Sequence, residues 1–227
     1  MNDASETTTA ELTAEARPFG WMLAVGAVLT LAFAFIHPQI TSRELAGVLR
    51  EIAAGAAFNG AVHGTLLALS MVLVAGFYGL SRRLGLGRPA VALGMTFYAA
   101  GAMAFTGAAV INGFAFATFA GRYGNVAPDQ VAAVSAAFNL AGSIAATWAI
   151  LGAVATSAAI AAWSLALAGK GGAERIIGGL GILLGLATIA LVVTGTLMLD
   201  VHGFLLLVAS QTLWTLAVGV RMIQGRV

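Results

Sequence analysis

The chain has 227 residues, of which 60% are hydrophobic and only 9% are charged, and its mean hydropathy is +0.96. A soluble domain carries about a quarter charged residues and cannot bury this much apolar surface. The composition, with a net charge of only +2, therefore excludes a soluble enzyme, a disordered chain and a nucleic-acid-binding protein.

Residues 1–17 form a polar segment with four acidic side chains, Asp3, Glu6, Glu11 and Glu15. No basic stretch precedes an apolar run, so we expect a mobile cytoplasmic tail rather than a secretory signal peptide. Residues 18–227 are expected to form one transmembrane domain. Six apolar stretches in it reach about the 20 residues that a helix needs to cross a bilayer. They are roughly 19–37, 60–81, 90–119, 139–168, 176–199 and 203–221. The predicted fold is an all-α membrane bundle of six transmembrane helices.

Lys and Arg are divided unevenly between the two sides of this bundle. Three lie on one side, Arg43, Arg50 and Arg122, and the other eight of the 11 lie with the two termini. Because cytoplasmic loops carry the excess of Lys and Arg, both termini are predicted to be cytoplasmic. The chain has ten Arg and one Lys and is rich in Ala and Gly, which favours a bacterial inner membrane.

The loop before the second span has the pattern of an amphipathic helix. Leu45, Val48, Leu49 and Ile52 follow one another at helical spacing, with charged residues on the other side and Ser42 as the expected N-cap. The pattern predicts a short helix that lies at the outer membrane surface or continues the second span upward.

Two features suggest how the spans are arranged. Val62-His63-Gly64 recurs as Val201-His202-Gly203, which favours three sequential helical hairpins. Small residues recur every four positions at Gly181 and Gly185 and along the fourth span, and such faces allow helices to pack closely. These faces predict packing within the bundle, or contact with a second copy or with another subunit of a membrane complex.

The three histidines are predicted to lie at one depth. His37, His63 and His202 are each 19 or 20 residues from an arginine at the cytoplasmic end of the same span. At 1.5 Å per residue this separation is about 30 Å, one hydrocarbon thickness. Asp200, the one acid at the outer end of a span, falls in the same layer.

Imidazole and carboxylate groups are ligands of divalent metal ions, so His37, His63, His202 and Asp200 are the candidate metal ligands. Alternatively, His63 and His202, each followed by glycine, could hold a haem between two helices. Asn59 and Asn112 are candidate polar contacts to this layer. Two other interpretations stay open: a pH-sensitive or substrate-contacting polar cluster, and histidines that only anchor the helices at the membrane surface.

Gln211 is predicted to lie near the middle of the membrane, where an amide needs a hydrogen-bond partner. It indicates either a bond between helices or a contact to a solute. The leading hypothesis is a small membrane protein that handles a metal ion or haem at its outer side. The alternatives are a small-solute permease or channel, and a structural subunit without a cofactor. No residue pattern indicates an enzyme.

Overall fold

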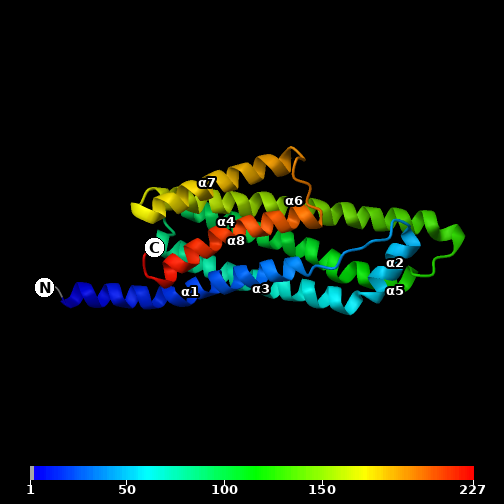
Figure 1. Cartoon of the computed structure of the whole chain (residues 1–227), viewed down its shortest axis with the longest axis horizontal. Coiled ribbons are helices and arrows are strands. Elements are labelled where there is room, and N and C mark those ends of the chain that lie inside the picture. The colour runs from blue at the N-terminus through cyan, green and yellow to red at the C-terminus, as the bar shows by residue number, and fades with distance from the viewer. Residues whose placement is uncertain (1–2) are drawn as a thin grey trace.

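The structure is a computed structural model that describes the backbone of residues 3–227 and the side chains of residues 16–127 and 129–227. Over this part of the chain the regular elements are all helical, and six segments are long and apolar enough to cross a membrane, as predicted. In chain order the elements are α1 (Asp3–Phe35), α2 (Leu45–Ala54), α3 (Ala56–Leu84), α4 (Pro89–Val110), the π-helix η1 (Ile111–Ala115), α5 (Phe116–Tyr123), the 3-10 helix η2 (Pro128–Gln130), α6 (Val131–Ala168), α7 (Gly172–Val193) and α8 (Val201–Ile223) (Figure 1).

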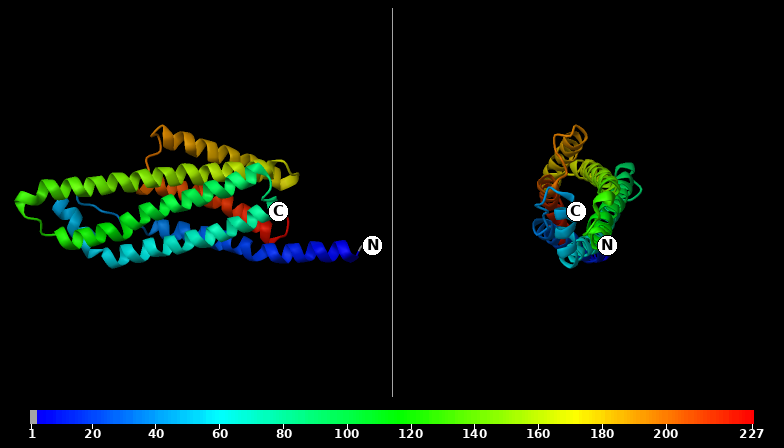
Figure 2. Two further views of the ribbon diagram at one scale, coloured as in Figure 1. Left: turned by 180° about the vertical axis from the view of Figure 1, so that it is seen from behind. Right: turned by 90° about the vertical axis from the view of Figure 1, so that its right-hand side faces the viewer.

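The six spans surround a common centre. Each packs against the next in the order α1, α3, α4, α6, α7, α8 and back to α1, and the end-on view shows this arrangement (Figure 2). Helices that follow one another in the sequence, α1 with α3, α4 with α6 and α7 with α8, are neighbours, as the predicted hairpins require.

Aromatic side chains fill the centre of the bundle. Phe77 and Trp163 stack with their ring centroids 4.6 Å apart, and Tyr98 and Trp214 pack around them. The indole N–H of Trp163, which is fully buried, donates to the Ser81 hydroxyl at 2.9 Å. A buried N–H without an acceptor would be costly, so this bond allows a large apolar ring to occupy the core.

The glycines of α7 pack against α6. A Cβ at Gly178, Gly181 or Gly185 would collide with α6 main-chain or side-chain atoms, the closest of which is the Ser164 hydroxyl. The small-residue face of α7 is therefore used within the chain, where it lets two backbones approach. α7 lies at the edge of the bundle beside α6 (Figures 1 and 2).

Several predicted boundaries differ from the structure. The predicted tail belongs to α1 from Asp3 onward, so Pro18 lies inside a helix and not in its first turn. No glycine or proline precedes Pro18, so nothing in this stretch ends the helix, and the proline removes one backbone bond. α7 ends at Val193, before the predicted 199, because the chain turns through Gly195, whose φ of 71° is left-handed.

One end of the bundle extends past the end of α7. α6 has 38 residues and α7 has 22, which correspond to about 57 and 33 Å. The extension is completed by α2 and α5, which pack on the start of α6 through a buried cluster of Leu49, Ile52, Ala120 and Val134. The predicted amphipathic helix is thus confirmed as α2, whose apolar face contacts protein.

Ser42 does not cap α2, because Glu44 is the N-cap residue and makes no side-chain capping bond. Instead, the Glu51 carboxylate accepts hydrogen bonds from the main-chain N–H and the hydroxyl of both Thr41 and Ser42, at 2.6–3.1 Å. These bonds lower the pKa of Glu51, the Ser42 hydroxyl having the largest effect. The Glu51 carboxylate thus holds the segment that leads into α2 against this helix.

Candidate functional site

Two of the three histidines meet at the level where α1 ends. His37 lies in the segment that follows α1, and His63 lies in the second turn of α3 with 4% of its surface exposed. Their rings contact each other at a centroid distance of 4.8 Å and an interplanar angle of 71°, and the two Nε2 atoms are 3.2 Å apart. The two rings therefore make an edge-on, T-shaped contact and do not meet head to head.

The neighbouring carbonyl groups determine which ring nitrogens carry hydrogen. His37 Nδ1 lies 3.0 Å from the Pro38 carbonyl oxygen, and His63 Nδ1 lies 3.0 Å from the Asn59 carbonyl oxygen. A carbonyl oxygen only accepts, so each Nδ1 must be the donor. In two neutral rings each Nε2 then holds a lone pair, and the two Nε2 atoms lie only 3.2 Å apart, so the lone pairs repel each other. A cation between them would remove this repulsion.

The π-helix η1 supports His63 from the other side. Gly113 packs so closely on this ring that a Cβ there would lie 2.4 Å from His63 Cβ. The Asn59 amide Nδ2 donates at 2.8 Å to the carbonyl oxygen of Asn112. A π-helix changes the hydrogen-bond pattern of its helix and often occurs at functional sites. Here it brings a glycine against the ring and presents a carbonyl to the residue one turn before His63.

The electrostatic environment of His37 favours the neutral ring. Burial lowers its pKa, and the bond to the Pro38 carbonyl opposes this effect only in part. A neutral imidazole with its Nδ1–H held by a carbonyl is the form in which histidine binds metal ions. His37 is only half-buried, so the pair can be reached from the surface of the protein.

The four-ligand site predicted from His37, His63, His202 and Asp200 does not form. Among the described residues no group of three or more His, Cys, Asp or Glu side chains is placed to hold a metal ion. His202 is exposed, and the Asp200 carboxylate caps α8 by accepting from the Gly203 N–H at 2.8 Å. The helical rise fixes the depth of a residue but not the direction in which it points, and helix packing decides the latter.

The other predicted polar residues have structural contacts. The Gln211 amide Nε2 donates to the hydroxyls of Thr156 and Ser157 at 3.0 and 3.1 Å, so it joins α8 to α6. Asn112 acts through its main-chain oxygen, as described above. Sequence reasoning missed the π-helix and Gly113, although the adjacent Asn112 and Gly113 within an otherwise apolar span were a possible signal.

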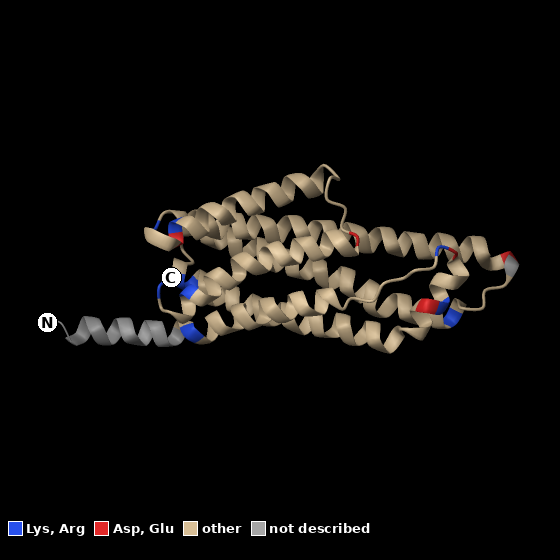
Figure 3. Cartoon of the chain, viewed as in Figure 1, with Lys and Arg blue, Asp and Glu red and all other residues tan. Residues whose placement is uncertain are grey.

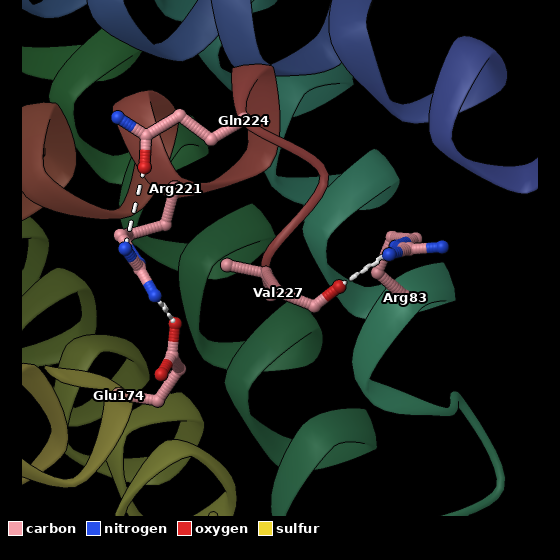
Figure 4. A network of polar contacts seen from close by, with 5 residues as sticks. All are labelled: Arg83, Glu174, Arg221, Gln224 and Val227. Carbon is pink, nitrogen blue, oxygen red and sulfur yellow. Dashed lines mark hydrogen bonds and ion pairs between the residues drawn. The ribbon is translucent and has the colours of Figure 1, made fainter. Parts of the chain in front are cut away.

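A second polar network lies at the arginine-rich end, where the α3–α4 and α6–α7 loops and residue 227 are found (Figures 3 and 4). Arg221 donates to the Glu174 carboxylate through Nε at 2.7 Å and through Nη2 at 2.5 Å, and to Gln224 at 3.2 Å. Arg83 donates through Nε and Nη2 to the Val227 main-chain oxygen at 2.9 and 2.5 Å. These contacts tie α7 to α8, and the last residue of the chain to α3.

Comparisons with protein-family models, with curated proteins and with solved structures find no match for this chain.

Proposed function

We propose that this membrane protein binds a divalent transition-metal ion, such as Zn²⁺ or Cu²⁺, between His37 Nε2 and His63 Nε2. One observation carries the proposal: in two buried or half-buried imidazoles, each with Nδ1 held by a carbonyl, the Nε2 atoms that carry the remaining lone pairs lie 3.2 Å apart. Imidazole nitrogens are common ligands of both ions, and a carbonyl on the other ring nitrogen is the usual support of such a ligand.

The separation of the nitrogens supports a metal ion. Two nitrogens bound to one tetrahedral ion at 2.0–2.1 Å lie about 3.3 Å apart. The observed 3.2 Å is close to that value. Two protein nitrogens leave the other coordination positions to water or to a further ligand.

The alternatives receive less support. The Nε2 of His63 faces His37 and not His202, which gives no basis for a haem between His63 and His202. The Gln211 amide N–H groups are bound to hydroxyls of a neighbouring helix, which supports the interhelical-bond interpretation over a solute contact. We favour handling or storage of a metal ion over transport for this reason.

We further propose that the protein lies in a bacterial inner membrane with both termini in the cytoplasm. The support is the division of Lys and Arg, eight against three, between the two ends of the bundle. In this orientation the His37–His63 pair faces the outside of the cell.

The test is metal titration of the purified protein in detergent. We expect one Cu²⁺ per chain, with an electron paramagnetic resonance spectrum that reports two nitrogen ligands, and one competing Zn²⁺ by calorimetry. His37→Ala and His63→Ala should each weaken binding by more than the 10–100-fold that loss of an outer-shell partner costs. His202→Ala is the matched control and should bind as the parent does.

Three results would overturn the proposal: no saturable binding, a spectrum without two coordinated nitrogens, or equal losses in His202→Ala and His63→Ala. A pair that shares a proton instead of a metal ion would give the first result. Thermal unfolding of each variant in the absence of metal shows whether a loss of binding is merely a loss of fold.

A further inference from the structure

Three cationic side chains flank two loops that buried packing brings together at the arginine-rich end, because Leu84, Val91 and Leu167 beside these loops belong to one buried cluster. Arg83 ends α3, Arg88 precedes α4, and Lys170 lies between α6 and α7. The Arg88 side chain folds back over Gly85, whose φ of 95° turns the first loop. Burial lowers the pKa of Lys170, and the positive charges of Arg83 and Arg88 lower it further, so the three cations lie within each other's field.

The acceptors described beside this cluster are bound by arginines. The negative charge of Glu174 acts on Lys170, but this carboxylate is held by the Arg221 guanidinium at 2.5–2.7 Å (Figure 4). Arg83 donates to the Val227 main-chain oxygen through Nε and Nη2, which leaves its Nη1 group to bind another acceptor. Among the residues with described side chains, neither Arg88 nor Lys170 forms an ion pair. Like charges within each other's field repel, and an anion between them would offset this repulsion.

The surroundings of the cluster indicate the kind of anion. The two loops connect membrane-spanning helices, so they lie at the membrane surface. Apolar side chains within two turns of the cations are exposed, Leu86 at 40%, Leu93 at 51% and Leu165 at 58%. An anion bound here would have acyl chains or other apolar groups beside it. Basic pockets between transmembrane helices bind the head groups of anionic lipids, and arginine is suited to phosphate oxygens.

We propose that Arg83, Arg88 and Lys170 form a binding site for the phosphate of an anionic phospholipid head group. The phosphate lies between the two loops and joins the α3–α4 hairpin to the α6–α7 hairpin. A zwitterionic lipid has the same phosphate, but its ammonium group offsets the charge that the cluster attracts.

The test is native mass spectrometry of the detergent-purified full chain with added phosphatidylglycerol or phosphatidylcholine. We expect phosphatidylglycerol to be retained in preference to phosphatidylcholine. Each surface cation contributes about a fivefold gain in affinity for anionic lipid, so R88Q/K170Q should retain phosphatidylglycerol about 30-fold less strongly. R43Q/R122Q, which removes two exposed cations at the opposite end, is the matched control and should retain it as the parent does.

Equal retention of the two lipids, or equal losses in R88Q/K170Q and R43Q/R122Q, would overturn the proposal. A third arm measures thermal protection by inorganic phosphate, and protection equal to that by phosphatidylglycerol would assign the cluster to a free phosphate and not to a lipid. Circular dichroism of R88Q/K170Q tests its helix content, and Arg83 is left intact because it also holds the Val227 oxygen. The outcome is independent of the His37–His63 metal site.

Discussion

Replacing Gly113 with alanine should displace His63, because the π-helix brings this glycine against the imidazole. The new methyl carbon would lie 2.4 Å from His63 Cβ and 2.6 Å from its Cγ. Non-bonded carbon atoms are at their optimum about 3.5–4.0 Å apart, so one of the two helices must move by about 1 Å or more. Overpacking of this kind costs about 1–3 kcal/mol.

Gly121→Ala is the matched control, because nothing lies within 4 Å of a Cβ at this α5 position. Both substitutions gain the better helix propensity of alanine, which is worth up to about 1 kcal/mol. The difference in stability between the two variants therefore reports the collision with His63 alone. For a chain of this length we expect a Tm for Gly113→Ala about 2–12 °C below that of Gly121→Ala.

The assay is thermal unfolding in detergent, followed by metal titration of the same samples. A displaced His63 Nε2 should weaken metal binding by about 10–100-fold in Gly113→Ala and leave it unchanged in Gly121→Ala. Equal Tm values for the two variants would refute the close packing of Gly113 on His63. A lowered Tm with unchanged metal affinity would refute the role of this packing in the site.

Three further predictions concern other parts of the molecule. The first concerns Glu51, whose pKa is lowered and whose carboxylate accepts from the Thr41 N–H. At a pH above the pKa of a free glutamate, the ionised carboxylate should protect this N–H from hydrogen exchange. The protection should be lost as the pH falls through the lower pKa of the folded protein. Glu51→Gln should lack this dependence on pH. If the Thr41 exchange rates of the parent and of Glu51→Gln stay different at low pH, the prediction is wrong. Gln211→Leu removes two hydrogen bonds between helices and should lower the free energy of unfolding by about 0.5–2 kcal/mol. An unchanged free energy of unfolding would contradict this prediction. The chain has no cysteine, so a single introduced cysteine reports the side of the membrane on which it lies. In intact cells an impermeant maleimide should label Gly121→Cys and not Gly87→Cys. The reverse labelling pattern would show that the topology is opposite to the proposed one.

The sequence was sufficient to predict the six spans, and it also predicts a common depth for the histidines. Both follow from the helical rise and the thickness of a bilayer, which depend on residue counts alone. The direction in which each histidine points depends on the rotation of its helix, which packing partners set. His37 and His63 meet because α1 packs against α3, whereas His202 lies on the exposed side of α8.

The helix ends and the π-helix were harder to predict for different reasons. α7 stops at Val193 because of Gly195, a single glycine among 29, so its position in the sequence is not distinctive. The π-helix depends on contacts between segments about 50 residues apart, namely the Asn59 amide on the Asn112 carbonyl and His63 against Gly113. Local propensity does not contain such contacts.

The two proposed sites share one helix but are physically separate. α3 carries His63 near one end and Arg83 near the other, 20 residues and therefore about 30 Å apart. Between them lies the packed aromatic centre around Phe77, whose stacked rings leave α3 little freedom to bend. Substitutions that far apart, with no shared partners, usually have additive effects. The proposed head-group site therefore lies at one end of α3 and the proposed metal site at the other, and each proposal can fail its own test without affecting the other.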